Sequence, residues 1–151
     1  MLRKNDGFSL HELMVIIGIM AIMCAIAIPS VIGWLPRYRM SSAARELLGA
    51  MEFARQNAVR QNAVVVVNFN YADKTYHATI GGAALRTWKM PPGVDLKQPS
   101  SQALGASVRY NNQGMPVDAS GNAVSGKVAI GGGGPDKVIS LSAGGSIRIE
   151  K

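Results

Sequence analysis

Few side chains in this chain have the chemistry and spacing of a reactive site. The 151 residues include two histidines, His11 and His77, and one cysteine, Cys24. A catalytic triad or a metal centre needs several such groups brought together, and no such cluster is evident in the sequence. The glycine run at 131–135 lacks the lysine and the following Ser or Thr of a phosphate-binding loop, so it is interpreted as a flexible loop. We therefore predict that the chain is not an enzyme and that it has no catalytic residue, cofactor or metal site.

The most unusual ionisable residue is Glu12, because it directly precedes Leu13–Pro36, a stretch without any charged residue. A carboxylate at the mouth of a membrane helix is costly unless it finds a partner. The helix macrodipole offers one explanation, since it favours acidic side chains in the first turn. A cationic partner from another molecule offers a second. The chemistry of Glu12 alone leaves both open.

The apolar run that follows has the length of a membrane span. About 20 apolar residues cross the hydrocarbon core as a helix, and Leu13 to Leu35 is long enough. Basic residues at 3 and 4 favour a cytoplasmic N-terminus, whereas Arg37 and Arg39 on the far side oppose it. Cys24 lies inside the run, where a thiol behaves as a small apolar group, and a lone cysteine cannot form an intramolecular disulfide.

Residues 7–14, Gly-Phe-Ser-Leu-His-Glu-Leu-Met, resemble the cleavage motif of prepilins. The resemblance implies that prepilin peptidase cuts between Gly7 and Phe8 and methylates the new amine of Phe8. It also makes Glu12 the fifth mature residue and the residue of subunit assembly. Pro29 falls where pilins usually carry a helix-bending proline. Residues 1–7 would then be the leader, and the chain would be a substrate of the peptidase.

Cleavage at this position gives Glu12 a physical role. The new amine on Phe8 is a cation in the same low-dielectric layer as the carboxylate. Unit charges about 4 Å apart attract by roughly 4 kcal/mol at an effective dielectric of 20, from which desolvation must be subtracted. The amine of one subunit can thus meet Glu12 of its neighbour. His11 stands where the family usually has an apolar residue. It either bonds a neighbour's Glu12 and makes assembly pH-sensitive, or lies at the headgroup level.

Two other processing routes fit the same segment less well. Ala25-Ile26-Ala27 has the small-x-small pattern of a secretory cleavage site, but the apolar run is long for a signal peptide and Glu12 interrupts its start. A lipoprotein site ending at Cys24 is weaker still, because Met23 stands where a small residue is needed. A mature chain that begins at Phe8 indicates prepilin processing, and one that begins at Ile28 indicates secretion.

Helical periodicity continues beyond the apolar run and predicts one long helix over Ser9–Gln61. Its second half carries a one-sided apolar stripe, which predicts docking on a sheet. Pro29 and Pro36 should kink this helix, since each removes a backbone donor. The stripe consists of Met40, Ala44, Leu47, Met51, Ala54 and Ala58, widened by Ala43, Leu48 and Val59.

Strand-like alternation begins after the helix and predicts a small antiparallel domain. The fold class is therefore α+β, a long bent helix packed on a small β domain. We divide the chain into a leader (1–7), a membrane or filament-core helix (8–36), an amphipathic helix (37–62) and a periplasmic β-rich domain (63–151). Residues 97–106 and 112–126 are predicted loops. The predicted strands are 63–69, 75–80, 84–90, 108–111, 127–130, 138–142 and 146–149.

Downstream segments at 55–59, 108–114, 138–142 and 145–149 resemble the GspH/FimT group of pilin-like proteins. The resemblance implies a minor pilin or a minor pseudopilin of type II secretion, which primes or caps a filament with other pilin subunits. It also implies a single pass through the inner membrane. A lone membrane-anchored periplasmic protein is the alternative outside the filament class.

The net charge of +7 admits an anionic partner but does not select one. The basic residues are scattered, which is typical of an ordinary solvated surface. Some FimT-like pilins bind DNA for uptake, and this resemblance supplies a second alternative within the filament class. Such a receptor would need exposed cations, for which Lys137, Arg148 and Lys151 are the candidates.

Overall fold

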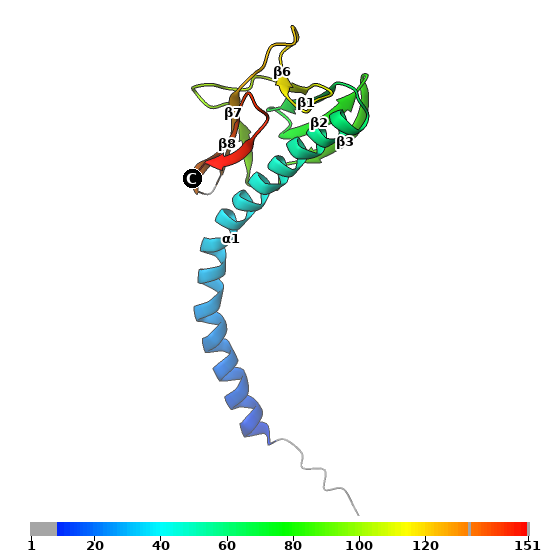
Figure 1. The fold of residues 1–151 in the computed structure, drawn as a ribbon. Coiled ribbons are helices and arrows are strands. Elements are labelled where there is room, and N and C mark those ends of the chain that lie inside the picture. The colour runs from blue at the N-terminus through cyan, green and yellow to red at the C-terminus, as the bar shows by residue number, and fades with distance from the viewer. Residues whose placement is uncertain (1–8, 133, 151) are drawn as a thin grey trace, which may run out of the picture. The chain divides into compact units, whose positions relative to one another are not determined.

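The computed structural model describes residues 9–132 and 134–150, and within residues 28–32 it describes the backbone alone. The described chain forms one long helix and nine strands in the order α1 followed by β1 to β9 (Figure 1). It divides into two compact units, Met1–Leu35 and Pro36–Lys151. The first unit contains the N-terminal half of α1, and the second contains the remainder of α1 and every described strand.

Helix α1 runs from Leu10 to Arg60 as one continuous helix that includes both Pro29 and Pro36. The helix predicted over Ser9–Gln61 is thus confirmed to within one residue at each end. The kinks at the two prolines stay a prediction. An interior proline removes one backbone donor, and the hydrogen bonds of the neighbouring turns continue the helix past it.

The second half of α1 buries the predicted stripe. All six of its main residues are buried, together with Ala43, whereas Leu48 is half-buried. The predicted stripe wrongly included Val59, which is 50% exposed, and it omitted Ala50, which is buried. Alanine at this many contact positions allows the sheets to approach the helix backbone closely.

The helix lies against two antiparallel sheets. The first, sheet A, has the order β3-β2-β1-β5-β6, and the second, sheet B, has the order β4-β7-β8-β9. Sheet A consists of β1 (Val65–Asn70), β2 (Thr75–Ile80), β3 (Ala83–Lys89), β5 (Ser107–Tyr110) and β6 (Pro116–Val117). Sheet B consists of β4 (Asp95–Lys97), β7 (Gly126–Gly132), β8 (Gly134–Leu141) and β9 (Ile147–Glu150).

The α+β fold is confirmed, and two short strands were missed. Strand β4 pairs with β7, and β6, which lies inside a predicted loop, pairs with β5. The glycine run was wrongly interpreted as a loop, since β7 continues through Gly132 and β8 begins at Gly134. Glycine is needed at Gly132, because φ is +131° and a Cβ there would collide with the carbonyl oxygen of Gly93.

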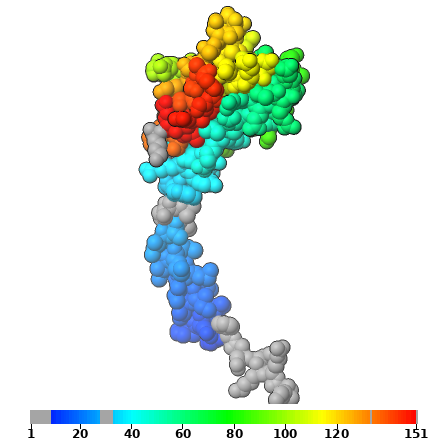
Figure 2. Space-filling view, viewed as in Figure 1, coloured from blue at the N-terminus to red at the C-terminus, as the bar shows by residue number. Residues whose placement is uncertain are grey.

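One hydrophobic core joins α1 to both sheets. Its buried cluster includes Leu47 and Met51 of α1, Val65 of sheet A and Ile139 of sheet B. On sheet A, the rings of Tyr76 and Trp88 stack with centroids 5.5 Å apart, and Phe53 of α1 packs edge-on against Trp88. Figure 2 shows the C-terminal strand, in red, directly beside the cyan part of α1 on the surface of the second unit.

Candidate assembly surfaces and basic residues

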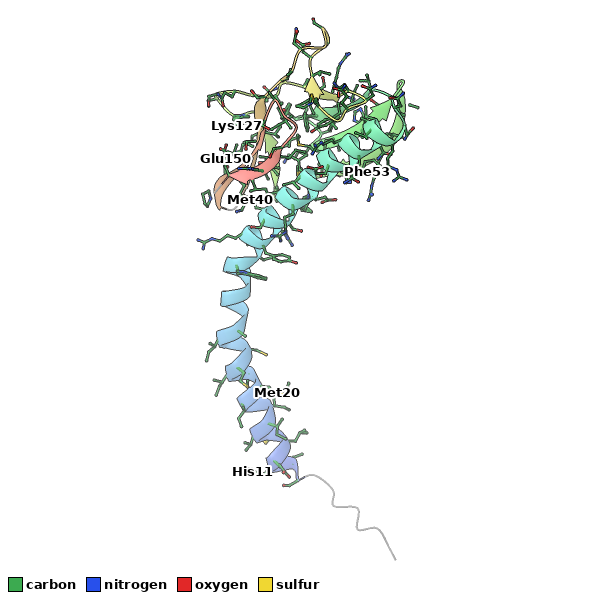
Figure 3. All side chains as sticks on the ribbon, viewed as in Figure 1. His11, Met20, Met40, Phe53, Lys127 and Glu150 are labelled. Carbon is green, nitrogen blue, oxygen red and sulfur yellow. The ribbon has the colours of Figure 1, made fainter. Side chains whose placement is uncertain are left out.

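The N-terminal half of α1 presents apolar side chains on every side. From Leu10 to Ala27 all residues are exposed, and the segment is long and apolar enough to cross a membrane by length and composition. Leu10 is 78% exposed and Ile26 is 74% exposed. Figure 3 shows side chains, Met20 among them, projecting from this part of the helix. From Leu13 to Ala27 no charged residue interrupts this surface, and a helix that is apolar all round belongs in lipid or in a packed assembly.

The start of α1 is capped, and the sequence contains a signal for this that the prediction did not use. The backbone amide of His11 donates to Ser9 Oγ over 3.3 Å, and the amide of Leu13 donates to the carbonyl oxygen of Ser9. Ser9 and Glu12 have the S-x-x-E spacing of a capping box. Glu12 thus occupies the first helical turn, where the helix dipole favours its charge.

The predicted site residues near the N-terminus are distributed as follows. Gly7 and Phe8 lie outside the described residues. The side chains of Glu12 and His11 are exposed, so both are accessible to another molecule. Pro29 lies within α1, in the part whose side chains are not described, and Pro36 is an exposed helical residue at the start of the second unit.

The candidate cations for DNA contact lie on different faces of sheet B. Side chains alternate between the two faces of a strand. Lys137 therefore shares a face with Ile139, which is buried against the core. Arg148 pairs in register with Ser140, on the opposite face. Lys151 lies outside the described residues. Strand alternation thus separates Lys137 from Arg148. It places Lys127 on the same face as Arg148, across Ser140, with which both residues pair.

Arg148 borders a polar hollow on the outer face of sheet B. The hollow has a volume of about 420 Å³, and it is lined mainly by serines, with Gln102 and Lys127. Lys127 Nζ lies 3.0 Å from Glu150 Oε2, so its charge is already compensated. Arg148 has no ion pair among residues 9–132 and 134–150. The hollow therefore has one uncompensated cation, too few for a polyanion track.

Arg55 joins the turns of the two sheets at the C-terminal end of α1, a role that the sequence did not reveal. Its Nε donates to the carbonyl oxygen of Gly114 over 3.1 Å, in the turn before β6. The same side chain lies against Gly145, in the turn between β8 and β9. Both glycines have positive φ, at +76° and +83°, which other residues rarely adopt. Arg55 also forms an ion pair with Glu52, in which Nη1 lies 3.7 Å from Oε1.

Tyr110 is buried next to this contact. Burial raises the pKa of Tyr110 above its ordinary value, the charge of Glu52 raises it further, and Arg55 opposes both. Its hydroxyl has no hydrogen-bond partner within the part of the chain that the structure describes. Burial likewise raises the pKa of Tyr76. Both tyrosines therefore stay protonated well into the alkaline range.

In the part of the chain that the structure describes, acidic, histidine and cysteine side chains do not gather into a potential metal site. Among the described residues no group of three or more could hold a metal ion. His77 lies on β2, and His11 lies in the N-terminal unit.

The architecture defines the class of protein first. A solved structure of the type IV minor pilin FimU from Pseudomonas aeruginosa matches with a TM-score of 0.62 and 23% identity, covering 76% of this chain and 90% of that chain. The minor pseudopilin EpsH from the type II secretion system of Vibrio cholerae matches with a TM-score of 0.56 and 9% identity, covering 74% and 96%. At these identities the likeness establishes the pilin-like fold.

The family is identified from the sequence of the second unit. Residues 43–145, more than half of the chain, match the model of the type II transport protein GspH. The chain therefore belongs to the GspH family of pilin-like proteins. A direct comparison with curated proteins gives no significant sequence match. The matched range begins within the amphipathic half of α1, so the prepilin motif at residues 7–14 is an independent observation.

Proposed function

We propose that this chain is a minor pilin or pseudopilin subunit that assembles through the N-terminal half of α1 into a type IV pilus or a type II secretion pseudopilus. The observation that carries the proposal is the exposed apolar segment Leu10–Ala27, with Glu12 in its first turn, on a chain of the GspH family. Before assembly the segment anchors the chain in the inner membrane, with the β domain in the periplasm. In the filament it packs against the same segment of other subunits.

Processing precedes assembly in this proposal. Prepilin peptidase removes residues 1–7, and the amine of Phe8 becomes the methylated N-terminus. The exposed carboxylate of Glu12 then accepts the cationic amine of an adjoining subunit. Each charge offsets the desolvation cost of the other, which fixes the stagger of subunits along the filament. The spacing of Ser9 and Glu12 is compatible with this role, because a carboxylate can accept several hydrogen bonds.

A minor position in the filament, in priming or capping, is the finer part of the proposal. It is supported by family membership and by the two minor subunits whose folds match, FimU and EpsH. Of the described candidates for DNA contact, Lys137 and Arg148 face opposite sides of sheet B, which gives the DNA-receptor alternative less support.

The test compares Glu12→Gln with Glu46→Gln. Glu46 is an exposed carboxylate farther along the same helix, so its variant is the matched control. We expect both variants to begin at Phe8 and to remain in the membrane fraction. Glu12→Gln should be at least about tenfold depleted from sheared filaments, which corresponds to about 1.4 kcal/mol of the gross attraction between the charges. Glu46→Gln should assemble normally.

Two results would contradict the proposal separately. Normal incorporation of Glu12→Gln into filaments would remove the assembly role of the carboxylate. A mature N-terminus other than Phe8, found by N-terminal sequencing of the natural protein, would remove the processing step.

A further inference from the structure

The first charged residues after Glu12 lie at the start of the second unit, and their positive charge is unexpected on this side of the apolar segment. Arg37 and Arg39 precede the next acidic residue, Glu46, and both are exposed. Basic residues usually concentrate on the cytoplasmic side of a membrane helix, whereas these two follow the apolar segment. Arg39 Nη1 donates to the carbonyl oxygen of Pro92 over 3.5 Å, whereas Arg37 has no ion pair within residues 9–132 and 134–150.

Arg37 opens onto a hollow at the base of the β domain. Arg37 and Met40 of α1 border it on one side, Asp136 and Lys137 of β8 on another, and Glu150 of β9 completes it. Its volume is about 480 Å³. Figure 3 shows Glu150 beside the part of α1 that carries Met40. The hollow thus brings together two cations, Arg37 and Lys137, that are 100 residues apart in the sequence.

The two carboxylates in the hollow do not neutralise these cations. Asp136 Oδ1 is already 3.2 Å from Lys97 Nζ, and Glu150 Oε2 is 3.0 Å from Lys127 Nζ. Arg37 and Lys137, by contrast, have no ion pair within residues 9–132 and 134–150. The hollow therefore has an excess of positive charge that is open to an external anion.

The short stretch of chain between the apolar segment and Arg37 identifies the class of anion. About 20 helical residues cover the hydrocarbon core of about 30 Å. Counted from Leu13, this length ends near Gly33, so Arg37 lies about 6 Å farther along the helix at 1.5 Å per residue. The headgroup layer on each side of a bilayer is about 5–7 Å deep. Arg37 is thus at the level of lipid phosphates.

Aromatic residues flank Arg37 in the pattern of a membrane interface. Trp34 is 59% exposed and Tyr38 is 49% exposed. Tryptophan and tyrosine are enriched at the headgroup level, where an apolar ring and a polar tip are both accommodated. Their positions, one turn before Arg37 and directly after it, agree with the depth estimated from the apolar segment.

We propose that Arg37 and Lys137 form a binding site for the phosphate of an anionic phospholipid, which holds the base of the β domain on the membrane before assembly. The site rests on the membrane anchoring proposed above. It also gives Arg37 a purpose on the far side of the span: the arginine pairs with lipid there. Extraction of a subunit into a filament must then release this lipid.

The test measures lipid binding by the full chain in an uncharged detergent. Energy transfer from tryptophan to phosphatidylglycerol with a dansyl-labelled acyl chain reports binding. The double variant Arg37→Gln/Lys137→Gln should bind about thirtyfold more weakly, at about fivefold for each basic residue near an anionic headgroup. The control Lys89→Gln/Arg109→Gln loses the same charge from exposed positions on sheet A and should change binding less than twofold.

The outcomes separate this proposal from its rivals. Equal weakening in both double variants would show a general effect of net charge and would overturn the site. Equal displacement of the probe by inorganic phosphate and by unlabelled phosphatidylglycerol would show a site for soluble anions and would also overturn it. Release of the wild-type chain from membranes by alkaline carbonate would contradict membrane anchoring itself, independently of the binding measurement.

Discussion

Removal of the Arg55 side chain should destabilise the second unit, because this residue joins the turns of both sheets. The Nε donor holds the carbonyl oxygen of Gly114 at 3.1 Å. A hydrogen bond to a charged group contributes about 1.5–3 kcal/mol. The side chain of Arg55 is 37% exposed, so the low end applies. The pair with Glu52 adds about 0.3 kcal/mol. Arg55→Ala should therefore lower the free energy of unfolding by about 2 kcal/mol.

The assay is thermal unfolding of the full chain in detergent, followed by near-UV circular dichroism of the buried aromatic residues. A loss of this size should lower Tm by roughly 6–10 °C. Arg45→Ala is the matched control, since Arg45 is an exposed cation on the same helix, and it should change stability by less than about 0.5 kcal/mol. Arg55→Lys should recover at most half of the loss, because lysine keeps the charge but lacks the Nε donor.

The reasoning fails if Arg55→Ala is no less stable than Arg45→Ala. In that case the contact with Gly114 contributes nothing, and the core alone holds the two turns together. Full recovery by Arg55→Lys would show instead that charge, and not the position of the donor, stabilises the turns.

Two further changes probe the same region. Gly145→Ala should lower the free energy of unfolding by about 2 kcal/mol in a denaturant titration, because φ is +83° and a Cβ would lie 3.0 Å from the carbonyl oxygen of Gly114; an unchanged midpoint would contradict this. Tyr110→Phe should be neutral or stabilising, since the hydroxyl has no partner among the described residues; a loss above 1 kcal/mol would reveal a hydrogen bond. Because burial raises the folded-state pKa of Tyr110 and Tyr76, stability should hold below the ordinary tyrosine pKa of about 10 and fall as pH rises beyond it; Tyr110→Phe should weaken that fall.

The sequence was informative wherever a signal is local and repeats. The apolar run after Glu12 and the apolar stripe from Met40 to Ala58 both have helical periodicity, which predicted α1 to within one residue at each end. Seven strands were found from alternation and turn residues. The strands that were missed, β4 and β6, have three and two residues. Such short strands contain no measurable period, and their identity comes from pairing with β7 and β5.

The parts that only the tertiary structure decided depend on contacts between distant residues. The glycine run belongs to a strand pair because β7 and β8 pair through Gly132 and Gly134, and the left-handed backbone of Gly132 lies against the carbonyl oxygen of Gly93. Arg37 and Lys137 share one hollow because α1 and β8 meet at the base of the domain. Sequence determined which segment is apolar enough for a membrane or a filament, since this follows from local composition. Packing decided which charges meet, since that requires the chain to bring together residues about 100 positions apart.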